Sequence, residues 1–267
     1  MKIERKKELT MANILILDTE TISAEAKRFC YNVGWVVYNT DTQECLEEKD
    51  RVVEQIWHNA ELFATAYYAE KKNLYISAMR GKRATLDKWG YVMRELARDI
   101  REHHVQAVFA YNSPFDDSVI EFNCDWFHTI NPLENVPVKD IRGMVSAYIT
   151  NTKEYIDFCE EHQLLTEAGH YSTTAESVAR FILNDPTFEE EHTALADAQL
   201  ETDIIQECIN RGAGVMEHYK VTASIPRRIP KPLRLVVDGE TVYEGEFIKK
   251  WSKEGYYRFT TPDGIEE

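Results

Sequence analysis

The segment Asn13-Ile-Leu-Ile-Leu-Asp18-Thr-Glu20-Thr-Ile22 decides the predicted fold. Its four apolar residues, 14–17, form a short bounded run that is typical of a strand buried on both faces. Asp18 and Glu20 end that run, and the two-residue alternation of a strand places them on the same side. Two like charges there would repel each other and lose hydration, which a divalent cation between them would offset. The segment therefore predicts a cation site, with a solvated acidic strand end as the alternative.

The composition is that of a protein with enough apolar material for a substantial core, since 43% of the 267 residues are hydrophobic. No run of 18 apolar residues occurs, so we predict no membrane partner. The five cysteines are scattered and lack a Cys-x-x-Cys pair, which predicts a cytoplasmic protein without a disulfide framework or zinc site. Residues 1–11 are charged and resemble no signal peptide, so we expect a flexible tail, and Met11 is an alternative start.

The net charge of −15 is unusual for a protein that binds long nucleic acid through its phosphates. Residues 213–267 hold nine basic and nine acidic side chains, so the whole deficit lies in residues 1–212. Between His218 and Val237 there are five basic residues and no acidic one. This run is either an ordinary solvated surface or a strip that contacts nucleic acid.

The remaining pattern predicts alternating strands and helices, with an antiparallel meander at the start. Strands are expected at 32–38, 45–53, 105–111 and 136–141. Helices are expected within 54–80, over 89–100, from Ser113, and at 142–150, 153–163, 174–183 and 193–210. Residues 12–212 form one predicted domain. Residues 213–267 are predicted to be a proline-containing linker and a small β appendage, with two strands around an Asp-Gly turn in 235–243 and a third at 256–260.

A second acidic motif, Asn112-Ser-Pro-Phe-Asp116-Asp117, follows a predicted strand and opens a helix. Ser113 suits the N-cap and Pro114 the first helical position. Asp116 would then lie three residues after the cap, where it could complete a capping box rather than bind a cation.

A third motif is Glu191-His192-Thr-Ala-Leu-Ala-Asp197, where a helix begins near residue 193. Asp197 falls inside a helix that otherwise buries apolar side chains, so it needs a partner or a metal. His192, at the mouth of that helix, could remove a proton from water near neutral pH. A solvent-facing Asp and a surface His are the alternative readings.

Taken together and in this order, the three motifs resemble those of the DEDD exonuclease superfamily. The histidine five residues before the last aspartate is similar to that of the DEDDh branch, which includes proofreading exonucleases and ribonuclease T-like enzymes. The branch with tyrosine is disfavoured, since its tyrosine would fall at Thr193. The resemblance covers residues 12–212 and includes a glycine in the second strand, Gly34. It implies an α/β, ribonuclease H-like fold with a mixed five-stranded sheet flanked by helices.

The resemblance also implies an activity, 3′-to-5′ exonuclease hydrolysis that releases nucleoside 5′-monophosphates from single-stranded DNA or RNA. Two cations, Mg²⁺ or Mn²⁺, would be held by Asp18, Glu20, Asp116 and Asp197, with Asp117 as a rival for the third position. His192 would be the general base, although Glu189, Glu190 and Glu191 would hinder it if they lie close. The terminal nucleotide would bind at Thr19, Thr21, Ile22 and Asn112.

Two other functions remain open at this stage. One is a phosphodiesterase of dinucleotides or other short oligonucleotides, which would suit the acidic surface. The other is a weakly active accessory module that binds nucleic acid. A homodimer, or a replication or repair partner bound through the appendage, is also possible.

Overall fold

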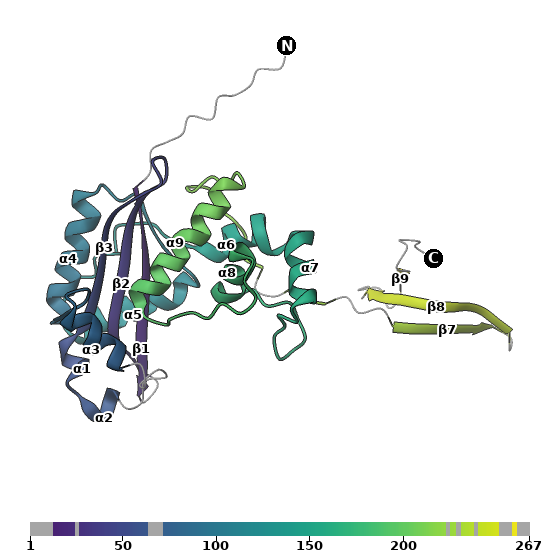
Figure 1. The fold of residues 1–267 in the computed structure, drawn as a ribbon, viewed down its shortest axis with the longest axis horizontal. Helices are drawn as coiled ribbons and strands as arrows, with labels where there is room; N and C mark the ends of the chain where they lie inside the picture. The colour runs from purple at the N-terminus through teal and green to yellow at the C-terminus, as the bar shows by residue number, and fades with distance from the viewer. Residues whose placement is uncertain are drawn as a thin grey trace, which may run out of the picture.

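A sheet of six strands runs through the main domain in the order β4-β3-β2-β1-β5-β6. Figure 1 labels β1, β2 and β3 of this sheet. The computed structural model describes residues 13–24, 27–63, 72–222, 225–227, 231–237, 240–250 and 258–260. The six strands are β1 Asn13–Ala24, β2 Lys27–Asn39, β3 Glu44–Val53, β4 Thr85–Asp87, β5 Ala107–Ala110 and β6 Val138–Asp140. β2 pairs antiparallel with β1 and with β3, whereas β4, β5 and β6 each pair in parallel with their neighbours.

The sheet has one strand more than the five we expected. The additional strand, β4, pairs with the end of β3 at the edge of the sheet. It is only three residues long. Alternation of apolar and polar residues cannot be recognised over so short a segment, so only the tertiary pairing reveals the strand.

Helices cover both faces of this sheet. They are α1 Glu54–Trp57, α2 Ala60–Phe63, α3 Lys72–Arg80, α4 Trp89–Glu102, α5 Ser113–Trp126, α6 Ile141–Val145, α7 Lys153–Glu161, α8 Ala175–Leu183 and α9 Ala194–Asn210, with a π-helical turn, η2 Ser146–Thr150, after α6. One core lies between the sheet and the α4 and α5 helices. A second core lies between the sheet and the helices from α6 to α9.

The side chains of β1 alternate between these two cores. Leu15 and Leu17 pack in the core of α4 and α5, whereas Ile14 and Ile16 pack in the core of α9. The predicted strand with two buried faces is thus confirmed, and the even-numbered residues from 14 to 20 point towards α9. A register shift between Glu20 and Thr21 ends this alternation. The strand is longer than expected, because it continues past Glu20 to Ala24. The two carboxylates therefore lie within β1 and not at its end.

The chain after α9 stays in contact with the main domain for some way. Ala213 is buried in the core of α9, and the backbone of Thr222 donates to Ser146. Ile225 forms a β-bridge with Tyr171, and Arg227 forms an ion pair with Glu160. The described parts of the segment from 213 to 227 thus pack against the domain that ends at α9.

The C-terminal appendage contains the expected three-stranded antiparallel sheet, β7 Lys231–Val237, β8 Glu240–Lys250 and β9 Arg258–Thr260. The predicted N-terminal tail and the Asp-Gly turn at residues 238–239 lie outside the described residues. Among the residues that the structure does describe, no helix combines the length and the apolar character needed to cross a bilayer.

Candidate active site

Carboxylates from β1 and α9 meet above the α9 face of the sheet. The side-chain oxygens of Asp18, Glu20 and Asp197 include one atom from each residue within 4.8 Å of one another. Asp18 and Glu20 reach this place because their positions on β1 share the face of Ile14 and Ile16. Asp197 reaches it from the first turn of α9, which Figure 1 shows lying across β1 and β2. The structure therefore brings three of the four predicted cation ligands together.

The fourth predicted ligand, Asp116, is fixed beside the same strand. Its Oδ1 accepts hydrogen bonds from the Thr19 backbone N–H at 3.1 Å and from the Thr19 hydroxyl at 2.7 Å. Asp116 is 3% exposed and its charge acts on Asp18. The neighbouring Asp117 is only half-buried. The aspartate that faces β1 is therefore Asp116.

The start of α5 differs by one residue from our prediction. Asn112, in the left-handed conformation with φ 71°, is the N-cap, and Ser113 is already helical. Asp116 accordingly makes no capping box with Ser113. Its carboxylate instead accepts a hydrogen bond from the Thr19 hydroxyl on β1. The backbone N–H of Asn112 donates to Asp140 Oδ1 at 3.2 Å, which fixes the turn between β5 and α5.

Gly34 and Asn32 on β2 set the position of α9. A Cβ atom on Gly34 would lie 2.1 Å from the Leu195 nitrogen and 2.2 Å from the Ala194 carbonyl carbon, so only glycine permits this close approach. Asn32 is fully buried, and its Oδ1 accepts from the Ala194 N–H at 3.0 Å. Its amide nitrogen also donates to Asp50. Sequence reasoning missed Asn32, since a single amide in an apolar strand carries no motif.

Burial and mutual repulsion disfavour the charged forms of these acids. Burial raises the pKa of Asp116 to about 7 against the hydrogen bonds from Thr19, with Asp140 adding a smaller repulsion. The pKa of Asp18 is raised well above its ordinary range, first by burial and then by Asp116, Glu201, Asp197 and Glu20. Without a counter-charge, the cluster therefore retains protons that isolated carboxyl groups would lose.

The site fits divalent cations by the chemistry of its donors. Hard cations such as Mg²⁺ and Mn²⁺ take carboxylate oxygens, and the cluster offers several within a few ångström of each other. A bound cation would offset the burial and mutual repulsion that raise the pKa values of Asp18 and Asp116. The residues that would hold it are Asp18, Glu20, Asp116 and Asp197.

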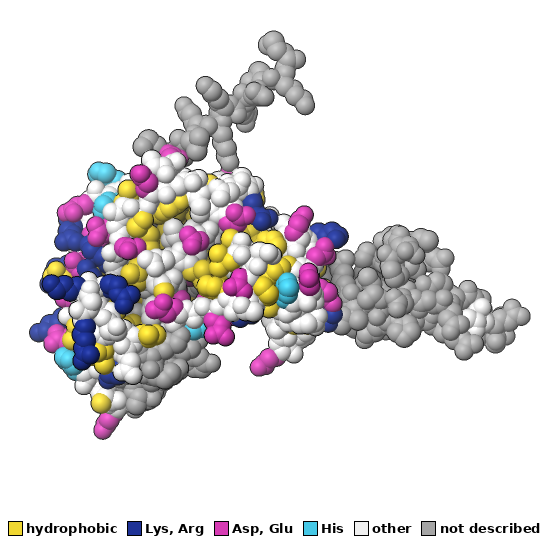
Figure 2. All heavy atoms as spheres, viewed as in Figure 1, with side chains coloured by type: hydrophobic (Ala, Val, Ile, Leu, Met, Phe, Trp, Pro, Cys, Tyr) yellow, Lys and Arg dark blue, Asp and Glu magenta, His cyan; other side chains and the backbone are white. Residues whose placement is uncertain are grey.

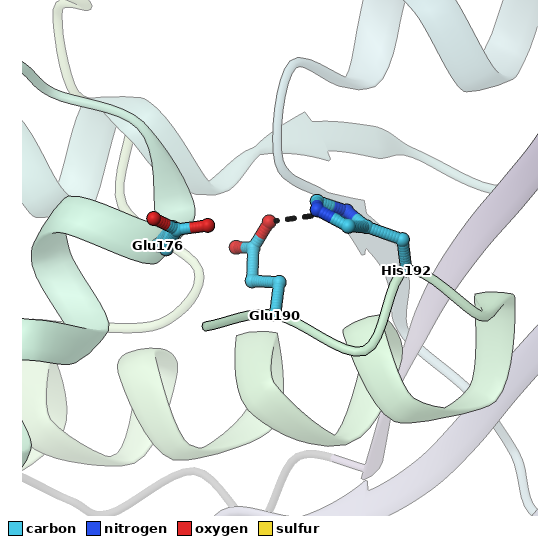
Figure 3. A group of neighbouring side chains, drawn as sticks. All are labelled: Glu176, Glu190 and His192. Atoms are coloured by element: carbon cyan, nitrogen blue, oxygen red, sulfur yellow. Dashed lines mark ion pairs between the residues drawn. The ribbon is translucent and has the colours of Figure 1, made fainter. Parts of the chain in front are cut away.

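His192 lies in the loop before α9, with φ 54° and its side chain half-buried. Figure 3 shows its imidazole turned towards Glu190, which lies between His192 and Glu176 of α8. The His192 Nδ1 and Glu190 Oε2 atoms are 3.6 Å apart. Of the three glutamates expected to hinder His192 if they lie close, Glu190 is thus close to the imidazole. Glu176 is itself paired with Arg180. A carboxylate in this position orients the ring and stabilises its protonated form.

The four predicted nucleotide-binding residues differ in how far they are exposed. Thr19 is buried and bonded to Asp116, and Ile22 is 1% exposed within the core of α4 and α5. Ile22 is therefore covered in this structure, and its role in binding the terminal nucleotide stays a prediction. Thr21 is half-buried and Asn112 is exposed.

A pocket of about 440 Å³ lies beside the site. Its wall includes Glu191 and Thr193, which flank His192, together with Tyr75, Lys82 and Arg83. Figure 2 shows many Lys and Arg side chains on the side of α3 and α4, and mainly Asp and Glu around α9. The pocket thus joins an acidic face to a more basic one.

Comparison of the whole chain with solved structures reveals the same architecture elsewhere. The nuclease domain of 3′hExo, a DEDDh family member bound to rAMP, superposes with a TM-score of 0.50 at 14% identity, over 76% of this chain and 94% of that one. The chain shares the fold of this nuclease domain. A structure of 3′-exonuclease with the histone mRNA stem-loop superposes with a TM-score of 0.51 at 12% identity, over 96% of both chains. No protein-family model and no curated protein sequence matches the chain.

The predicted ribonuclease H-like α/β fold is therefore confirmed, with helices on both faces of a mixed sheet.

Sequence reasoning also overlooked Glu201, a buried acid one turn beyond Asp197 on α9. The signal was present, since residues four apart on a helix share a face. Glu201 lies among the buried positions 198, 202 and 205 of α9, so an acid on this face was recognisable.

Proposed function

We propose that this protein is a metal-dependent 3′-to-5′ exonuclease that releases nucleoside 5′-monophosphates from single-stranded ends. The observation that carries the proposal is the meeting of Asp18, Glu20 and Asp197, with ligand atoms within 4.8 Å of one another and Asp116 fixed alongside. A structural acidic cluster of this kind is unfavourable without cations, because each charge raises the pKa of the others. The fold that the chain shares with the nuclease domain of a DEDDh family member supports the same reading.

The chain's own residues have distinct roles in this proposal. Asp18, Glu20, Asp116 and Asp197 hold two cations, Mg²⁺ or Mn²⁺. Two such ions stabilise the attacking and leaving oxygens of an in-line phosphoryl displacement. His192 takes the proton from the attacking water, and Glu190 holds the imidazole in position from 3.6 Å away. Thr19 keeps Asp116 directed at the site through its hydroxyl.

A single-stranded end is the favoured substrate because of the charge distribution. The net charge of −15 offers little attraction to the many phosphates of a long duplex. Lys82 and Arg83 line the pocket beside the site together with Glu48, Asp50 and Glu191, so their positive charge is local and suits only the few phosphates near an end. Within the basic run after His218, Arg227 already pairs with Glu160. The two solved structures compared above contain rAMP and an RNA stem-loop, so RNA is the first polymer to test.

The direct test is a time course on matched 20-nucleotide DNA and RNA with Mg²⁺ or Mn²⁺, labelled at either end. A 5′ label should yield a ladder of shortening products, whereas a 3′ label should appear at once in mononucleotides. Asp18→Asn should remove nearly all hydrolysis, while Asp157→Asn, an exposed aspartate on α7, should leave it unchanged. Hydrolysis by Asp18→Asn at the wild-type rate would refute the proposal.

A phosphodiesterase of dinucleotides is the second candidate, favoured by the acidic surface around the site. A dinucleotide carries a single internal phosphate and needs little basic surface. Faster cleavage of a dimer than of a 20-mer of the same sequence would select this function. Binding of both substrates without any turnover in Mn²⁺ would instead indicate an accessory module.

A further inference from the structure

A fifth acid, Glu201, lies in the site and has no assigned role. It follows Asp197 by one turn of α9, so the two side chains share a face of the helix. Glu201 is 3% exposed, and its helical neighbours Ala198 and Ile205 are fully buried. A glutamate at such a position is rarely this buried without a charged partner.

The hydrogen bonding of Glu201 is incomplete. The Tyr111 backbone N–H, directly after β5, donates a hydrogen bond to its carboxylate. The Oε2 atom is buried and finds no hydrogen-bond partner within the described part of the chain. A buried carboxylate oxygen without a partner is unfavourable by about 1–3 kcal/mol or more, so its retention needs an explanation.

The charged groups that act most strongly on Glu201 are themselves acids. Asp116 acts most strongly, followed by Asp197 and Glu190, and Glu201 in turn acts on Asp18. The fold therefore concentrates a further negative charge where two predicted cation ligands already lie. Burial and these neighbours raise the pKa of Glu201 well above its ordinary range. A cation beside Asp116 and Asp197 is the group that would compensate this charge.

We propose that Glu201 is a positioning residue of the cation site, whose unpartnered carboxylate strengthens the binding of Mg²⁺ or Mn²⁺ next to Asp116 and Asp197. The inference rests on the proposed function, since it assumes that these aspartates hold cations. Groups around a metal that do not ligate it directly change its affinity by about 10–100-fold when altered. The competing explanation is that Glu201 is a polar core residue with no influence on cations.

The experiment measures the affinity of the full-length protein for Mn²⁺ by calorimetry, at pH 7.5 and without substrate. Glu201→Gln keeps the shape of the side chain and removes its charge. Glu207→Gln is the matched control, because Glu207 lies on the same helix but pairs with Arg211 at 2.7 Å. Glu201→Asp retains the charge on a shorter side chain, and thermal unfolding in EDTA reports the fold of every variant.

We expect Glu201→Gln to stay folded in EDTA and to bind Mn²⁺ about 10–100-fold more weakly than wild type. Glu207→Gln should bind as wild type, and Glu201→Asp should recover part of the affinity. Wild-type Mn²⁺ affinity in Glu201→Gln would overturn this inference alone, and so would loss of the fold in EDTA by both Glu201 variants. Absence of Mn²⁺ binding by the wild-type protein would overturn the proposed function together with it.

Discussion

Gly34 of β2 and Ala194 of α9 are in backbone contact, so close that a Cβ atom on Gly34 would lie 2.2 Å from the Ala194 carbonyl carbon. Gly34 is also the register partner of Asp18 on β1. A residue without a side chain therefore brings the first turn of α9, and Asp197 with it, down onto the strand pair that carries the other acids.

Gly34→Ala should displace the first turn of α9, because the nearest atoms are backbone and cannot rotate away. Overpacking of this kind lowers the free energy of unfolding by about 1–3 kcal/mol. A displacement of Asp197 by about 1 Å should reduce nuclease activity roughly 100-fold. Urea unfolding and the labelled-oligonucleotide assay measure the two effects.

Gly90→Ala is the matched control for Gly34→Ala. Gly90 lies in α4, where a Cβ atom would meet only the Thr129 Cγ2 atom at 3.3 Å and a flexible Arg94 side chain. Alanine favours a helix over glycine by up to about 1 kcal/mol, so stability should stay equal or rise. Equal activity in Gly34→Ala and Gly90→Ala would contradict the role of the close contact.

Thr19→Val should weaken the site without unfolding the protein. Valine keeps the volume of threonine and the backbone hydrogen bond to Asp116, but loses the 2.7 Å bond from the hydroxyl. A loss of about 1 kcal/mol in stability and of about tenfold or more in Mn²⁺ affinity is expected. Thr187→Val removes an equivalent exposed bond to Asp185, also 2.7 Å long, and should change neither quantity. Calorimetry of Mn²⁺ binding to the two variants measures this difference in affinity.

The stability of the cation-free protein should fall as the pH rises from 5 to 8. The pKa of Asp116 is about 7 in the folded chain and 3.8 in its ordinary state, so the folded chain binds more protons in this range. The contribution of the Asp116 proton to the free energy of unfolding is complete below about pH 4. It is lost as the pH rises through 7, by an amount on the order of a few kcal/mol. Thermal unfolding in EDTA of wild type and Asp116→Asn would show it, since the asparagine variant should give the flatter profile.

Added Mn²⁺ should reverse that dependence. Cations bind the deprotonated carboxylates and displace protons, so the rise in melting temperature on adding Mn²⁺ should be larger at pH 8 than at pH 5.5. A rise of the same size at both values would show that the ion binds outside the carboxylate cluster.

Glu190→Gln should lower the turnover number about tenfold and leave Mn²⁺ affinity unchanged. The carboxylate lies 3.6 Å from His192 Nδ1 and stabilises the imidazolium that forms when the base takes a proton. Glu189→Gln, one residue earlier and exposed, should keep wild-type turnover. Steady-state kinetics on a short oligonucleotide provide the measurement. A Glu190→Gln enzyme that is faster than wild type would show that the carboxylate hinders the base.

Deletion of the appendage should begin after Arg227 and not after Gly212. Thr222, Ile225 and Arg227 each contact the main domain, so removing them would expose its surface. We expect a chain of residues 1–227 to fold and to cleave dimers at the wild-type rate. If the appendage binds nucleic acid, the KM for a 20-mer should rise while that for the dimer stays constant. An unchanged KM for both would exclude a nucleic-acid role for residues 228–267.

Much of this arrangement was predictable from the sequence because it depends on local periodicity. The apolar run before Asp18 predicts a strand buried on both faces, and the two-residue period predicts that Asp18 and Glu20 share a side. Helical spacing similarly predicts α4 and α9 to within a few residues. These features need only the alternation of side chains along one segment, so no knowledge of distant contacts is required.

Tertiary structure alone decided where the acids meet and what surrounds them. The sequence suggested a capping box for Asp116, whereas packing of α5 against β1 turns the carboxylate to Thr19. The short strand β4, the buried Asn32 that binds Ala194, and the unpartnered oxygen of Glu201 likewise became visible only in the fold. The physical reason is that hydrogen bonds, burial and repulsion depend on distances between segments far apart in the chain, and side-chain periodicity within one segment carries no record of those distances.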